Sequence, residues 1–275
     1  MKIGFIGCGN MATAILSRIA MHKLIASENI LCYDLSRETL LSAAERFSVQ
    51  ARESNSAVAL ESDLLFLAVK PQFYETVIDE IRDNIENQLI ISLAAGRSID
   101  WLEKHFFPNN QSDSVTKKIA LLRTMPNTPA LVGEGMTVLC PNRHVSKMQL
   151  EKVSEIFECC GKVEILPENL MNAVIAVSGS SPAYIFILIE AMADAAVAQG
   201  LPRKTAYQMA AQSVLGSAKM VLETSMHPGE LKDMVCSPGG TTIEAVSVLE
   251  ENGFRSAVIK AMSACADKAE RMQRD

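Results

Sequence analysis

The chain has 275 residues, of which 48% are hydrophobic and 21% are charged, so it is long enough for two domains and has the composition of a globular protein. Its formal net charge of −6 argues against a basic surface for nucleic acid.

The cysteines and the apolar runs indicate in which compartment the protein works and whether it binds metal. The seven cysteines are scattered, and neither they nor the four histidines show the spacing of metal ligands, so we expect reduced thiols and no metal site. The first residues run directly into a strand and lack the long apolar region of a secretory signal. The most apolar run, residues 183–189, is too short to span a bilayer. We therefore expect a cytoplasmic protein with no membrane partner.

Residues 1–163 alternate short apolar runs with amphipathic segments, which predicts an α/β domain. The expected strands are residues 2–6, 30–33, 64–68, 89–92, 120–124 and 136–140. Helical patterns fall between them, for example over residues 11–21, 36–47 and 74–85. Alternation of this kind indicates a mainly parallel, doubly wound sheet of the Rossmann type, with helices on both faces.

The turn after the first strand has the pattern of a dinucleotide site. Residues 7–12 read Gly-Cys-Gly-Asn-Met-Ala, which is GxGxxA between a strand and a helix. The first glycine permits the tight turn, the second lets the backbone approach a pyrophosphate, and the small alanine lets helix and strand pack closely. The helix N-terminus then supplies amides and a positive dipole. The alternative is a tight turn that binds nothing.

Asp34 closes the second strand, where a carboxylate can accept hydrogen bonds from ribose hydroxyls and so favour NADH. Ser36 and Arg37 follow it and could instead hold a ribose 2′-phosphate, so both cofactors stay open. A turn-forming aspartate is the structural alternative. The segments 68–71 and 94–96 also follow strands, at the edge of the sheet where open α/β sheets bind ligands.

Residues 164–275 form the second expected domain, in which helix formers dominate. Helices are predicted over residues 183–199, 202–224, 229–235, 241–251 and 254–272. Ser181 and Pro182 have the pattern of a helix start and Gly200 that of a helix stop, while Thr241 has the spacing of an N-cap in a capping box. The long helices are apolar on more than one face, which predicts burial against a second subunit.

The loop before residue 241 is the other candidate site. It reads Ser-Pro-Gly-Gly-Thr-Thr over residues 237–242, directly before a helix. Flexible backbone with unpaired amides at a positive helix end suits a small carboxylate. An interhelical loop with nothing bound is the alternative.

Residues 231–245 resemble the signature of the pyrroline-5-carboxylate reductases, and the resemblance extends over essentially the whole chain. Further landmarks in the same order are residues 6–12, 68–72, 123–129, 178–184 and 227–229. Two positions depart from some relatives, which carry a glutamate at position 225 and an asparagine at position 234, where this chain has Ser225 and Met234.

The resemblance implies NAD(P)H-dependent reduction of the cyclic imine 1-pyrroline-5-carboxylate to L-proline, the last step of proline synthesis, by a homodimer or by a decamer of dimers. It implies that the Thr242 hydroxyl lies at the ring nitrogen, as the catalytic group, and that the substrate carboxylate lies on the preceding turn. The expected substrate contacts are Glu168, Ser237, Gly239, Gly240, Thr241 and Thr242. The expected cofactor contacts are Ile6, Gly7, Cys8, Gly9, Asn10, Met11, Ala12, Asp34, Ser36, Arg37, Asn55, Ala68, Val69, Lys70, Pro71, Ala95 and Gly96.

Two other functions are weighed against this one. A β-hydroxyacid dehydrogenase would carry a lysine a few residues into the first long helix after a Gly-rich turn, but the next lysine after Gly179 is Lys204. A non-catalytic nucleotide sensor would not need the residues of the 237–242 loop.

Overall fold

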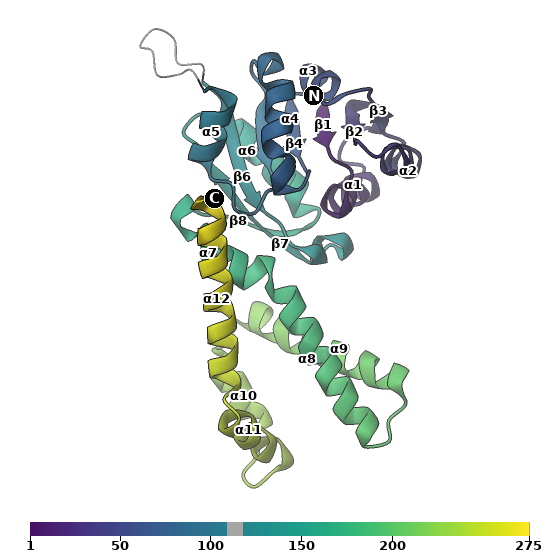
Figure 1. Ribbon diagram of the computed structural model, residues 1–275. Helices are drawn as coiled ribbons and strands as arrows, with labels where there is room; N and C mark the ends of the chain where they lie inside the picture. The colour runs from purple at the N-terminus through teal and green to yellow at the C-terminus, as the bar shows by residue number, and fades with distance from the viewer. Residues whose placement is uncertain (109–117, 275) are drawn as a thin grey trace. The chain divides into compact units, whose positions relative to one another are not determined.

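A computed structural model describes residues 1–108 and 118–274, which form two compact units (Figure 1). Unit 1 comprises residues 1–180 together with the C-terminal segment from residue 265, and unit 2 comprises residues 181–264. The domain boundary expected between residues 163 and 164 falls inside a strand of unit 1.

Unit 1 is built on one eight-stranded sheet. Its order is β3-β2-β1-β4-β5-β6-β7-β8, and neighbouring strands are parallel except for the pair β6 and β7. The strands are β1 (Ile3–Ile6), β2 (Ile30–Tyr33), β3 (Gln50–Ala51), β4 (Leu64–Leu67), β5 (Leu89–Ser92), β6 (Ala120–Met125), β7 (Gly135–Pro141) and β8 (Gly161–Ile165).

Six helices cover the two faces of this sheet and enclose two apolar cores. One core contains residues of α1 (Asn10–His22), α2 (Arg37–Phe47) and α6 (Lys147–Glu158). The other contains residues of α3 (Asn55–Glu61), α4 (Tyr74–Ile81) and α5 (Ile99–Phe106). The predicted doubly wound α/β fold is thereby confirmed. Short 3-10 turns occupy Ser27–Asn29, Pro71–Phe73, Arg82–Asn84, Thr128–Val132 and Glu168–Leu170.

The six predicted strands are confirmed, each to within one residue at either end, whereas β3 and β8 were not predicted. A two-residue strand such as β3 is too short to show a pattern. β8 lies at the edge of the sheet, and most of its side chains are exposed, so its charged residues hide the strand signal.

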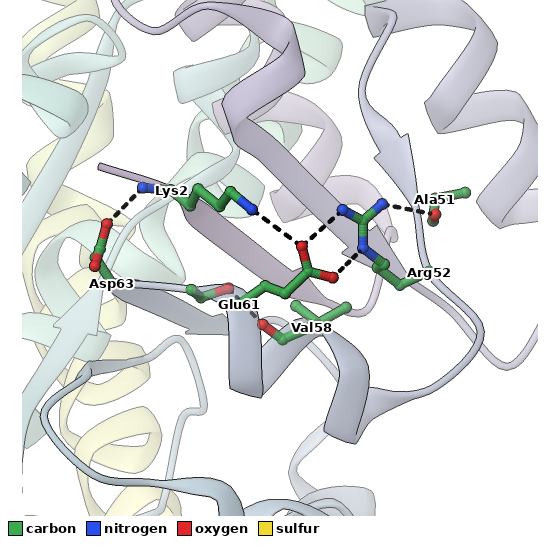
Figure 2. A network of polar contacts seen from close by, with 7 residues as sticks. Lys2, Ala51, Arg52, Val58, Glu61 and Asp63 are labelled. Carbon is green, nitrogen blue, oxygen red and sulfur yellow. Dashed lines mark hydrogen bonds and ion pairs between the residues drawn. The ribbon is translucent and has the colours of Figure 1, made fainter.

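The amino edge of the sheet carries a network of charged side chains (Figure 2). Glu61 at the end of α3 accepts hydrogen bonds from Arg52 Nε at 2.6 Å and from Lys2 Nζ at 3.1 Å. These two bonds lower the pKa of Glu61 to about 2. Nearby, Asp63 accepts from the backbone N–H of Lys2 at 2.6 Å. The network ties the start of β1 to the segments that follow β3 and α3.

A helical stretch runs from residue 168 to residue 198, through α7 (Met171–Val174), a π-helical segment (Ile175–Gly179) and α8 (Ser181–Ala198), with a bend at Ser180 before α8. The predicted helix start at Ser181 and Pro182 is confirmed to within one residue, because α8 begins at Ser181 with Pro182 in its first turn. Pro182 has no N–H to offer the carbonyl of Ser178, four residues earlier. That carbonyl instead accepts from Asn127 Nδ2 at 3.0 Å, so the proline leaves no buried acceptor unpaired.

Unit 2 consists of the helices α8, α9 (Arg203–Thr224), α10 (Pro228–Val235), α11 (Thr241–Glu251) and the first part of α12 (Phe254–Arg274). The predicted stop at Gly200 is confirmed, because Gly200 has a φ of +95° and donates to the carbonyl of Val197 at 2.9 Å.

The helices of unit 2 bury few of their apolar side chains within the described chain. Between residues 181 and 264, three alanines are the buried hydrophobic residues: Ala193, Ala206 and Ala210. By length and composition alone, the stretch Glu168–Ala198 could cross a membrane, but core helices of soluble proteins pass the same test. Contact with a second subunit is another arrangement that would bury the exposed apolar side chains of these helices.

Candidate functional site

A cavity of about 340 Å³ lies in unit 1 where β1, β2 and β4 end. Its walls come from residues at or just after the ends of these strands, together with the first residue of α3, Phe73 before α4, and residues of α4. They are Gly7, Gly9, Tyr33, Asp34, Leu35, Asn55, Ala68, Val69, Lys70, Phe73, Thr76, Val77 and Glu80. The carboxyl ends of parallel strands are where open α/β sheets bind ligands.

The two glycines of the first turn serve different purposes. Gly7 has a φ of +93°, and a Cβ there would lie 2.9 Å from the backbone nitrogen of Val69, so the close contact between the turns after β1 and β4 requires glycine. A Cβ at Gly9 would meet no atom within 4 Å, so the space beside it is open. Glycine at both positions therefore suits a turn against which a pyrophosphate can lie.

The N-terminus of α1 is free to bind an anion. Serine side chains cap α2, α3, α5 and α6, whereas Gly9 at the N-cap of α1 provides no side-chain cap, and the first turn of α1 contains no acidic residue. Unpaired amides at a positive helix end are the usual binding groups for a phosphate. The residues present thus fit a dinucleotide.

Cys8, between the two glycines, stays uncharged. A hydrogen bond with Cys32 and burial both raise the pKa of the Cys8 thiol. Its side chain is almost fully buried in the core rather than exposed in the turn. A thiol that remains protonated places no negative charge beside a bound pyrophosphate.

Asp34 holds the glycine turn in place. Its Oδ2 accepts from the backbone N–H of Cys8 at 2.8 Å, and its Oδ1 accepts from the backbone N–H of Ser36 at 2.8 Å. The turn-forming alternative for this residue is therefore part of its role. The carboxylate also lines the cavity and has further lone pairs with which to accept from a hydroxyl.

Seven of the predicted cofactor contacts line the cavity: Gly7, Gly9, Asp34, Asn55, Ala68, Val69 and Lys70. The others border it in sequence or lie elsewhere in unit 1: Ile6, Cys8, Asn10, Met11, Ala12, Ser36, Arg37, Pro71, Ala95 and Gly96. Sequence reasoning missed six lining residues: Tyr33, Leu35, Phe73, Thr76, Val77 and Glu80.

One of the missed residues, Glu80, has a direct connection to a predicted one. Its Oε2 accepts from Nδ2 of Asn55 at 2.7 Å, and Asn55 is largely buried. No local signal could have found it, because Glu80 is the last residue but one of α4 and its partner Asn55 lies 25 residues earlier. Glu80 fixes the amide orientation of Asn55 at the cavity wall.

Glu168, predicted as a substrate contact, makes two polar contacts within unit 1. Its Oε1 accepts from Arg123 Nη1 at 2.8 Å and from the backbone N–H of Ile99 at 2.8 Å. Burial is the main cause that raises the pKa of the neighbouring Cys140 to about 11, and the charge of Glu168 adds to it.

The 237–242 loop, in unit 2, is a tight turn that needs glycine. Gly239 has a φ of +66°, and a Cβ on Gly240 would lie 2.3 Å from the Ser237 hydroxyl oxygen. The predicted N-cap role of Thr241 is wrong: Gly240 occupies the N-cap without a side-chain hydrogen bond, and Thr241 is the first residue of α11. Thr241 and Thr242 thus both lie in the first turn of an uncapped helix, which leaves amides free for a carboxylate.

Among the residues that the structure describes, no group of three or more His, Cys, Asp or Glu side chains could hold a metal ion.

Comparison with known proteins identifies the family. Residues 168–272 match the family described as pyrroline-5-carboxylate reductase dimerisation, and residues 2–96 match the F420-dependent NADP oxidoreductase family. The pyrroline-5-carboxylate reductase of Escherichia coli is 48% identical over 99% of this chain and 98% of its own length. The human pyrroline-5-carboxylate reductase 2 is 37% identical over 99% of this chain and 84% of its own length.

Solved structures agree with these sequence matches. The Plasmodium falciparum pyrroline carboxylate reductase with NADP bound has a TM-score of 0.88 and 32% identity, over 99% of this chain and 98% of that one. A pyrroline-5-carboxylate reductase from Coxiella burnetii has a TM-score of 0.88 and 35% identity, over 98% of each chain. Because relatives of this kind match along almost the whole length of both chains, the chain belongs to the pyrroline-5-carboxylate reductase family.

Proposed function

We propose that this protein reduces 1-pyrroline-5-carboxylate to L-proline with NADPH or NADH, the last step of proline biosynthesis. The observation that carries the proposal is the 48% identity to a pyrroline-5-carboxylate reductase along 99% of the chain. The cavity at the ends of β1, β2 and β4, with its glycine turn and uncapped helix, supports the dinucleotide part.

The cofactor, when bound, supplies a hydride to the carbon of the C=N bond. The chain's own residues hold it: the amides at the start of α1 bind the pyrophosphate, and Asp34 accepts from the adenosine ribose. The remaining predicted contacts, from Asn55 to the turn at Ala95 and Gly96, complete the site. Ser36 and Arg37, next to Asp34, would receive the 2′-phosphate of NADPH.

The 237–242 loop receives the substrate. Amides around Gly240 and the Ser237 hydroxyl bind the carboxylate, and the Thr242 hydroxyl lies at the ring nitrogen. The substrate is already electrophilic as an iminium, in which the nitrogen carries its proton, so hydride addition to carbon yields the neutral ring amine without a further proton. The site therefore needs a positioning group more than a strong acid, and a hydroxyl that both donates and accepts suits this role.

The enzyme acts as a homo-oligomer. The match of residues 168–272 to a dimerisation family and the exposed apolar side chains of unit 2 support a homodimer, and a decamer of dimers is the larger assembly that we propose. All seven cysteines are free thiols, which supports a reducing compartment, and we propose the cytoplasm.

A reductase assay tests the proposal. Purified protein is mixed with NADPH or NADH and 1-pyrroline-5-carboxylate, and the loss of nicotinamide absorbance is compared with the formation of proline. Equal amounts of the two are expected. A β-hydroxyacid with NAD(P)⁺ serves as the alternative substrate. Turnover of the hydroxyacid but not of the imine, or tight dinucleotide binding with no turnover of either, would refute the proposal.

A further inference from the structure

The segment between β5 and α5, residues 93–98, carries the predicted cofactor contacts Ala95 and Gly96. It follows the end of β5, beside β4, whose own following residues line the dinucleotide cavity. Gly96 has a φ of +80°, which favours glycine, and a Cβ there would lie 3.1 Å from Met272 Cβ of α12. The backbone of this loop must therefore be held in one conformation.

Tyr74 holds the beginning of the loop. Its hydroxyl donates to the carbonyl of Leu67 at 2.6 Å and accepts from the backbone N–H of Leu93 at 3.1 Å. The side chain is fully buried, and burial raises its pKa to about 12, so the hydroxyl keeps its proton. One side chain thus joins the ends of β4 and β5, the two strands from which the cofactor segments depart.

Glu168 holds the end of the loop. Its Oε1 accepts from the backbone N–H of Ile99, the first residue of α5, and from Nη1 of Arg123, both at 2.8 Å. Arg123 has no accessible surface, and its Nε and Nη2 find no acceptor among the described residues, so Glu168 is the charge that compensates the buried guanidinium. The side chain of Glu168 is 32% exposed.

We propose that Arg123 and Glu168 are positioning residues for the cofactor. The guanidinium fixes the Glu168 carboxylate, and the carboxylate fixes the backbone at Ile99 and so the conformation of residues 93–98. The proposed role of Arg123 also explains why residues 123–129 resemble the family, although this segment lies outside the predicted cofactor and substrate loops. Arg123 acts through Glu168 and does not touch the cofactor.

Three variants separate charge compensation from loop anchoring. Glu168→Gln keeps an oxygen for Ile99 but leaves the buried guanidinium without a counter-charge. Arg123→Met removes the buried charge but leaves the carboxylate unoriented. The double variant has no uncompensated buried charge, so it should recover the stability that Glu168→Gln loses. It also lacks the guanidinium that orients the side chain at position 168, so residues 93–98 should stay as loosely held as in Arg123→Met.

The measurement is the dissociation constant of NADPH and NADH, by direct titration without imine, alongside the melting temperature. This keeps the result independent of the reductase assay that tests the proposed function. We expect each single variant to weaken cofactor binding by roughly tenfold or more. The double variant should bind cofactor as weakly as Arg123→Met, while its melting temperature lies above that of Glu168→Gln.

Val153→Ala is the matched control. It creates a cavity in the core beneath α6, so it should lower the melting temperature and leave cofactor binding unchanged. If Glu168→Gln does not fold, the cofactor dissociation constants of Arg123→Met and of the double variant are compared with those of the unchanged protein instead. A single variant that melts earlier but binds cofactor normally, or a double variant that binds cofactor as the unchanged protein does, overturns the proposal.

Discussion

Asp34 offers the sharpest test of how the dinucleotide site works. The change is Asp34→Ala, which removes the acceptor of two backbone N–H groups, those of Cys8 and Ser36, each at 2.8 Å from a carboxylate oxygen. The N–H of Cys8 belongs to a nearly buried residue, so it loses its partner where water does not readily replace it. The glycine turn should then lose its fixed conformation.

The expected cost follows from these contacts. A hydrogen bond to a charged group contributes about 1.5–3 kcal/mol, so the loss of the Cys8 contact alone should weaken binding of either cofactor by roughly 10–100-fold. If the carboxylate also accepts from ribose hydroxyls, NADH should suffer a further loss that NADPH does not share. The geometry therefore predicts a large effect on both cofactors, with an excess for NADH.

The assay is a titration of each cofactor, with the Michaelis constants as a second readout. Ser146→Ala is the control: it removes the N-cap of α6, outside the site, and should cost about 1 kcal/mol of stability without weakening cofactor binding. Normal binding of both cofactors by Asp34→Ala would refute the role in the turn. Equal losses for NADH and NADPH would refute only the ribose contact.

Three further predictions concern other parts of the chain. Thr242→Val should lower kcat/KM for the imine by roughly 10–100-fold with little change in cofactor affinity. The control Ser247→Ala, in the same helix, should leave kcat/KM unchanged. Normal turnover by Thr242→Val would show that Thr242 is not the group at the nitrogen. Light scattering should give at least twice the monomer mass of 29.9 kDa, and a monomer at micromolar concentration would contradict the proposed interface. Because the pKa of Glu61 is lowered to about 2, its ion pairs stabilise the fold above the pKa of the unfolded state and lose this effect as the pH falls toward 2. The melting-temperature difference between the unchanged protein and Glu61→Gln should therefore shrink in acid, and a difference independent of pH would count against these ion pairs.

The local signals in the sequence were sufficient for the fold class and for most of the elements. Six strands, helices in both units and the stop at Gly200 were predicted because each depends on residues within one short segment. The glycine turn was found for the same reason: strand, turn and helix lie within the first 22 residues. Where a signal was ambiguous, local reasoning failed, as at β8, whose exposed charged residues hide a strand.

Helix starts show a second limit. Thr241 has the residue type and spacing of a cap, yet it lies in the first turn of α11 behind Gly240. At the start of α8, the carbonyl of Ser178 that Pro182 cannot pair accepts from Asn127, which is 51 residues away. No pattern near Pro182 reports that partner.

The candidate site also has a part that local sequence predicts and a part that depends on tertiary contacts. The sequence by itself determined which segments carry the site, because the chemistry of a glycine turn or a Pro-Gly-Gly loop is local. Only the tertiary structure decided what Asp34, Tyr74 and Glu168 do, because the partner of Glu168 lies 45 residues away on β6 and the contacts of Tyr74 join two different strands. Such contacts depend on how the strands are ordered in the sheet, and that order is fixed by packing of the whole domain rather than by any one segment.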